Sequence, residues 1–142
     1  MNKEIKFRGK NTYNKKWYFG NLAYLNCENK YYIVNFDTNV YSIDTDYEHI
    51  IKDLDYTEII PETIGQYTGL KDKNGVEVYE GDKVMFDYEW TKPDEIGVIT
   101  WNKDTASFQI KGHIPSSSMK HLDRMKVIGN IYENEVDSNV KD

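Results

Sequence analysis

Apolar residues recur at every second position through most of the chain after Gly65, and this alternation restricts the fold more than any other feature. It begins around Asn74-Gly75, which lies between Leu70 and the alternating residues Val76 and Val78. Asn-Gly is the strongest short hairpin signal, because both residues tolerate the positive φ of a type I′ turn. The sequence therefore predicts an antiparallel hairpin at this point.

Further short strands are predicted beyond this hairpin. A second turn is expected at Glu80-Gly81-Asp82, and alternating segments then cover residues 83–88, 96–101, 107–110 and 125–132. Together with the strand at Val76–Val78, these make five short strands at nearly regular spacing with glycine-bearing turns between them. Such a pattern is typical of a small closed β-barrel. We therefore predict a mainly β chain with a barrel over residues 63–134.

The first part of the chain also alternates with a period of two. Residues 15–25 are predicted to form a strand, with Trp17 and Phe19 on one face and Tyr18 on the other. Further extended segments are predicted at residues 31–36, 40–43 and 56–60. We expect these segments to form a smaller β-rich region over residues 1–62.

A single helix is predicted in this first region, over residues 44–54. Tyr47, Ile50, Ile51 and Leu54 follow the spacing of one helical face, and an aspartate at the start of the segment can cap it. A second short helical turn is predicted after Ser118. The polar residues 135–142 are predicted to form a frayed tail.

Charge argues against some classes of partner. The formal net charge is −6 and the sequence pI is about 5.1, which disfavours general affinity for nucleic-acid phosphates or anionic membranes. The charge is unevenly spread, because residues 1–20 carry six basic residues against Glu4, whereas residues 28–62 carry nine acids against two lysines. The basic, aromatic N-terminal segment therefore leaves a nucleic-acid surface open as an alternative.

Cysteine content and hydropathy indicate the compartment. Cys27 is the only cysteine, so no disulfide forms within the chain. The N-terminus lacks the apolar stretch of a signal peptide, and no apolar run approaches the roughly 20 residues that span a bilayer. We expect a soluble, cytoplasmic protein that does not associate with membranes.

Residues capable of catalysis or metal binding do not form a recognised pattern. His49, His113 and His121 lack the paired spacing of zinc ligands. The run Asp72–Gly75 resembles the start of a calcium loop but has no second acid before the glycine, and a hairpin turn explains it better. Ser116–Ser118 lack a nucleophile elbow. We therefore predict no catalytic residues, no cofactor and no metal site.

Several longer motifs resemble the YopX family of phage and prophage proteins. They are Lys6-Phe7-Arg8-Gly9-Lys10, Trp17-Tyr18-Phe19-Gly20, the run from Thr63 to Asp72 with Asn74-Gly75, Val78-Tyr79-Glu80-Gly81-Asp82, Gly97-Val98 with Trp101, and Val127 to Tyr132. The resemblance implies a C-terminal SH3-like barrel preceded by a smaller β-rich region. The family carries no established activity, so the resemblance assigns no role to individual residues.

These observations favour a phage accessory protein that is not an enzyme and acts through protein–protein contact, either with an unknown partner or with itself. Aromatic and arginine side chains are favoured at such interfaces. The predicted interaction surface consists of Arg8, Trp17, Tyr18, Trp90 and Trp101. The alternatives are a nucleic-acid-binding module that uses the N-terminal segment and, with less support, an enzyme built around His113 and His121.

Overall fold

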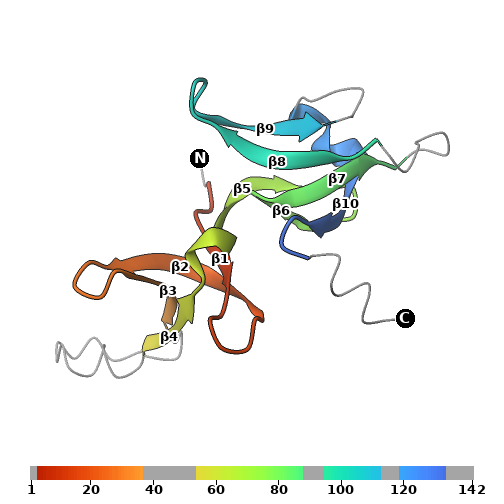
Figure 1. The fold of residues 1–142 in the computed structure, drawn as a ribbon. Coiled ribbons are helices and arrows are strands. Elements are labelled where there is room, and N and C mark those ends of the chain that lie inside the picture. Colours follow the sequence, from red (N-terminus) through yellow and green to blue (C-terminus); the bar gives the residue numbers. More distant parts are fainter. Residues whose placement is uncertain (1–2, 37–53, 88–94, 113–118, 134–142) are drawn as a thin grey trace. The chain divides into compact units, whose positions relative to one another are not determined.

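A computed structural model describes residues 3–36, 54–87, 95–112 and 119–133 (Figure 1). Over these ranges the chain is mainly β, with two antiparallel sheets and two short 3-10 helices. The chain divides into two compact units. The N-terminal unit comprises residues 5–65, and the C-terminal unit comprises residues 66–142 together with residues 1–4.

The N-terminal unit is built on four antiparallel strands in the order β4-β3-β2-β1. They are β1 (Phe7–Lys10), β2 (Trp17–Leu25), β3 (Lys30–Phe36) and β4 (Leu54–Ile59), followed by the 3-10 helix η1 (Pro61–Thr63). The strands predicted at residues 15–25, 31–36 and 56–60 are confirmed to within a few residues. Asn29, with a φ of 55°, forms part of the tight connection between β2 and β3.

One face of this sheet forms the core of the N-terminal unit. Ile33 and Ile59 are almost fully buried, with 2% and 1% exposure. A Cβ atom on Gly9 would collide with the side chain of Ile59, so close packing requires glycine at this position. The sheet curls, because the Ile60 amide donates to the Lys10 carbonyl at 2.9 Å and joins the end of β4 to the end of β1.

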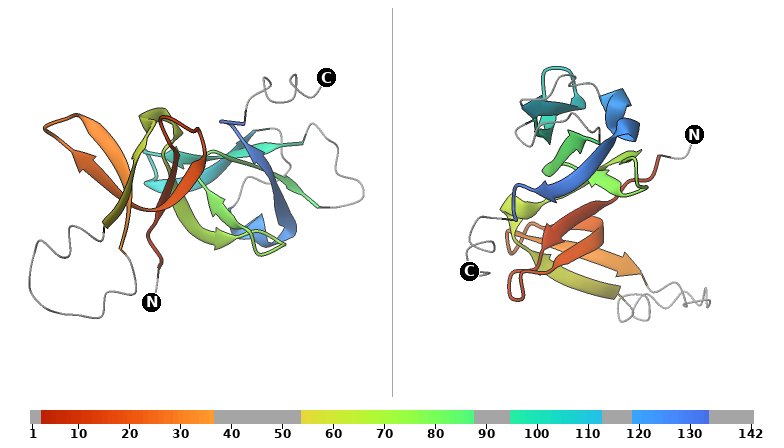
Figure 2. Two further views of the ribbon diagram at one scale, coloured as in Figure 1. Left: turned by 90° about the horizontal axis from the view of Figure 1, so that it is seen from below. Right: turned by 90° about the vertical axis from the view of Figure 1, so that its right-hand side faces the viewer.

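The C-terminal unit carries most of the remaining strands. They are β5 (Gly65–Lys71, whose first residue belongs to the N-terminal unit), β6 (Glu77–Tyr79), β7 (Asp82–Phe86), β8 (Gly97–Asn102), β9 (Ser107–Gly112) and β10 (Met125–Asn130). Strands β5 and β6 form the predicted Asn-Gly hairpin, and the others form a sheet in the order β10-β7-β8-β9. The 3-10 helix η2 (Met119–Arg124) contacts β9 and β10 (Figure 2). The core of this unit consists of Val78, Val84, Phe86, Ile99, Ile110, Leu122 and Met125.

The prediction that these strands close into a barrel is wrong for the described residues. All five predicted strands are present, but β6 pairs with β5, while β7 to β10 form an open sheet that ends at β9 and β10. The hairpin is attached to β10 by a side chain and a turn instead of a strand ladder. The Asp72 carboxylate accepts the Val127 amide at 2.9 Å, and the Lys73 amide donates to the Met125 carbonyl at 2.8 Å. The SH3-like barrel implied by the family resemblance is therefore not confirmed.

Some sequence predictions fall outside the described residues. These are the strand over residues 40–43, the helix over residues 44–54 apart from its last position, and the tail over residues 135–142. Leu54, predicted to end the helix, opens β4 instead. The helical turn predicted after Ser118 is confirmed as η2.

Candidate interaction surface

The N-terminal sheet carries apolar residues on the face opposite its core. Strand pairing places Ala23 opposite Tyr32 and Val34 opposite Tyr56. Because side chains alternate along a strand, these residues and Leu25 lie on the other side of the sheet from Ile33. We call this side of the N-terminal unit the outer face.

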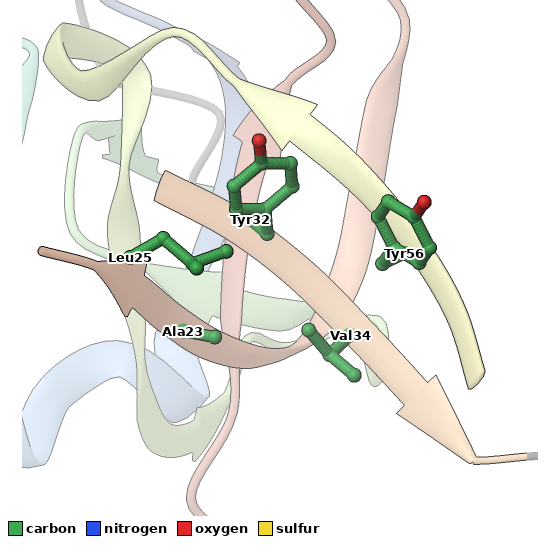
Figure 3. Close-up of a pocket in the computed structure, with 5 residues that line it drawn as sticks. All are labelled: Ala23, Leu25, Tyr32, Val34 and Tyr56. Atoms are coloured by element: carbon green, nitrogen blue, oxygen red, sulfur yellow. The ribbon is translucent and has the colours of Figure 1, made fainter. Parts of the chain in front are cut away.

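A hollow of about 210 Å³ lies on the outer face, and three strands contribute to its lining (Figure 3). Its lining residues are Ala23, Leu25, Tyr32, Val34 and Tyr56, none of which carries a charge. Leu25 is 42% exposed and Tyr56 is 66% exposed. The rings of Tyr32 and Tyr56 meet edge to face, with centroids 5.9 Å apart and planes at 69°. We call this feature the outer-face hollow.

Two carboxylates and one ammonium border the outer-face hollow. The Tyr32 hydroxyl donates to Glu28 Oε2 at 3.0 Å, and partial burial together with this bond raises the pKa of Tyr32. Lys30 Nζ lies 3.4 Å from Glu58 Oε1, and the hydrogen bond and charge of Glu58 raise the pKa of Lys30. Glu58 also accepts a hydrogen bond from the hydroxyl of Thr12 at 3.2 Å.

The structure brings together two of the five residues predicted to form an interaction surface. Arg8 is 6% exposed, and its guanidinium carbon lies 4.6 Å from the centroid of the Trp17 ring. Lys10 Nζ lies 5.5 Å from the same ring. Both are cation–π contacts. Trp17 therefore already interacts with two cations from its own unit.

The other three predicted residues lie elsewhere. Tyr18 is on the opposite face of β2 from Trp17, as predicted, and its hydroxyl accepts a hydrogen bond from Asn14 at 3.1 Å. Trp101 belongs to the C-terminal unit, where it is 48% exposed and stacks edge-on against Phe108 at 5.0 Å. Trp90 lies outside the described residues.

Sequence reasoning missed the residues of the outer-face hollow, although one signal was present. The four consecutive residues Tyr31 to Val34 are all aromatic or aliphatic. A strand in an antiparallel sheet with one solvated face normally alternates between apolar and polar residues. Loss of this alternation in a short strand indicates that the strand presents apolar side chains on both faces of the sheet.

The candidate metal and catalytic residues take structural roles or lie outside the description. Both Asp72 oxygens accept backbone amides, which explains this acid without calcium: Oδ1 binds Asn74 and Val76 at 2.8 and 2.9 Å, and Oδ2 binds Val127. Across the described ranges, no three His, Cys, Asp or Glu side chains are grouped as metal ligands would be. The ring of His121 lies 6.4 Å from that of Phe86. His49, His113 and Ser116–Ser118 lie outside the described residues.

Comparisons with known proteins give a family and a fold. The family model described as YopX protein matches residues 6–136. A solved structure described as protein EF1440 from Enterococcus faecalis is similar, with a TM-score of 0.54 and 23% sequence identity over 94% of this chain and 96% of that chain. No curated protein matched. In the described part of the chain, no helix has the length and apolar character needed to cross a membrane.

Proposed function

The chain belongs to the YopX protein family, and on this premise we propose that it is a non-catalytic phage or prophage accessory protein that binds another polypeptide in the host cytoplasm. The outer face of the N-terminal unit is the binding surface. The observation that carries this proposal is the outer-face hollow, an uncharged depression with exposed leucine and tyrosine side chains.

Burial of this surface by a partner is energetically favourable. Apolar area removed from water contributes about 25 cal/mol per Å², and contiguous exposed apolar patches commonly mark interaction sites. Tyrosine suits such a site, because its ring supplies contact area while its hydroxyl stays hydrated. Tyr56, at 66% exposure, supplies most of this accessible ring surface.

A nucleic-acid-binding role has weaker support. The outer-face hollow is lined by no cation, and the net charge of the chain is −6. Base stacking needs an accessible aromatic face, whereas Trp17 already contacts Arg8 and Lys10. Tyr13, at 83% exposure, and Phe19, at 48% exposure, are the remaining candidates for stacking in this segment.

Affinity capture with matched variants tests the proposed function. The tagged full chain is expressed in a bacterial host, cross-linked and recovered with and without nuclease treatment. Leu25→Asp places a charge in the hollow, while Ile131→Asp changes a similarly exposed residue, 47% accessible, in the C-terminal unit. We expect wild type and Ile131→Asp to recover the same polypeptide and Leu25→Asp to lose it.

Two results would contradict the proposal. Recovery of the same polypeptides by Leu25→Asp would exclude the outer face as the binding surface. Loss of all partners after nuclease treatment, accompanied by salt-dependent DNA binding of the purified chain, would favour the nucleic-acid alternative. Electrostatic binding to DNA is strongest in low salt, so the DNA measurement is made there.

A further inference from the structure

We infer that the outer-face hollow receives one lysine or arginine side chain from the partner polypeptide. This inference rests on the proposed function, because it specifies the chemistry of the group that the partner places on the outer face. Three properties of the hollow carry it: its size, its pair of tyrosine rings and the charges at its rim.

The size of the hollow fits a single side chain. Pockets that hold small-molecule ligands usually measure about 300–1,000 Å³, and the outer-face hollow measures about 210 Å³. Ala23, Leu25 and Val34 provide its aliphatic surface. Lysine and arginine bury their methylene stems against surfaces of this kind while the charged group remains at the edge.

The two tyrosine rings provide a site for the charged group. A cation within about 6 Å of an aromatic centroid is attracted to the ring face. The rings of Tyr32 and Tyr56 stand nearly perpendicular, at 69°, so they present differently oriented surfaces to the same space. Tyr56 is 66% exposed, which leaves much of its ring accessible to an incoming cation.

Charges at the rim complement a basic partner. Glu58 forms an ion pair with Lys30 at 3.4 Å, whereas Glu28 bonds the neutral hydroxyl of Tyr32 and interacts with Lys30 only through a weaker charge–charge attraction. The rim therefore carries a net negative charge. A lysine or arginine inserted beside Tyr32 meets the carboxylate of Glu28 on a rim of two carboxylates and one ammonium, while an acidic side chain is repelled by that rim.

Peptide titration of the full chain tests the inference. The probes are two acetylated and amidated peptides, Gly-Leu-Lys-Leu-Gly and the same peptide with norleucine in place of lysine. Binding is followed by NMR from the amide signals of the hollow residues. We expect the lysine peptide to shift these signals and to bind about tenfold more tightly than the norleucine peptide, with the difference shrinking in high salt.

Variants assign this preference to individual groups. Glu28→Gln and Tyr56→Leu are each expected to weaken binding of the lysine peptide about twofold to fivefold, consistent with loss of one charge or one cation–π contact. Tyr24→Leu is the matched control, because Tyr24 is 48% exposed on the opposite face of β2. We expect this control to leave peptide binding unchanged.

Three results would overturn the inference. Equal binding of both peptides would show that the hollow takes an apolar group. Absence of shifts at the hollow with either peptide would show that it is no side-chain receptor. Concentration-dependent dimerisation with shifts at the hollow and no peptide present would make a second copy the occupant. The capture experiment is independent of these outcomes, so loss of the partner in Leu25→Asp alone would still support the proposed function.

Discussion

The two sheets of this protein differ in the chemical character of the face that lies opposite their core. In the C-terminal unit, buried residues such as Ile99 and Ile110 alternate with residues of the other face, where Lys83, Lys111 and Lys126 occur. Lys126 there lies 3.5 Å from a carboxylate oxygen of Asp87. In the N-terminal unit, the face opposite the core carries the uncharged outer-face hollow. The C-terminal sheet thus presents lysine side chains to water. The N-terminal sheet presents an apolar hollow whose burial by a partner is energetically favourable.

The largest expected loss of stability follows a substitution on the buried face of the C-terminal sheet. Ile99 is fully buried, so Ile99→Ala should lower the free energy of unfolding by about 2–5 kcal/mol through lost burial and a cavity. Thermal and urea unfolding measure the loss. Val98→Ala is the neighbouring control on the other face, and an equal loss there would contradict the distinction between the two faces.

Removing the attachment of the β5–β6 hairpin should cause the next largest loss of stability. Asp72→Ala removes the acceptor of three backbone amides, and we expect a loss of about 2–4 kcal/mol, because bonds to a charged acceptor each contribute about 1.5–3 kcal/mol and do not add fully. Urea unfolding provides the measurement. Asp72→Asn can keep one acceptor oxygen and should lose less, and equal losses would argue against an oxygen-specific attachment.

A substitution on the outer face should change stability much less. Leu25 is 42% exposed, so Leu25→Ser should alter the free energy of unfolding by roughly 0.5 kcal/mol or less. Partner capture should nevertheless weaken, because the hollow loses an apolar wall. A large loss of stability would show that this face belongs to the core of the isolated protein, which would break the comparison between the two sheets.

The smallest effect concerns the pH dependence of the C-terminal unit. Burial raises the pKa of Glu80 above its ordinary value of 4.5, so the folded state disfavours its charged form. The free-energy cost of burying the charged Glu80 carboxylate is absent below its ordinary pKa. It develops as pH rises through the raised pKa that Glu80 has in the folded state. Glu80→Gln should therefore raise Tm slightly at pH 7 and not at pH 3. Glu62→Gln, in an exposed position, controls for the loss of one charge, and a Tm gain of equal size at both pH values would contradict burial as the cause.

The sequence predicted local structure well, because alternation and turn chemistry act over a few residues. It placed Trp17 and Tyr18 on opposite faces of one strand and located the Asn-Gly hairpin correctly. The barrel failed because alternation indicates which residues form strands and leaves open which strands pair. That choice depends on contacts such as the one between Asp72 and Val127, which are 55 positions apart.

The candidate site was harder to predict for a related reason. Tyrosine favours strands whether its ring is buried or exposed, so composition alone did not separate Tyr32 and Tyr56 from the other tyrosines. The register between β2, β3 and β4 brings Ala23, Val34 and these two rings to one place. The same register places Tyr24 and Tyr31 on the opposite face, where their rings lie 4.7 Å apart.

The Asp72 attachment also has a consequence for synthesis on the ribosome. A nascent chain that has emerged as far as Gly112 contains β5 to β9 but lacks the amide of Val127, which Asp72 binds in the finished fold. Domains generally fold as units as the chain emerges. The contacts of the hairpin with β10 therefore form only after that strand has been synthesised, and a chain truncated ahead of β10 would lack them.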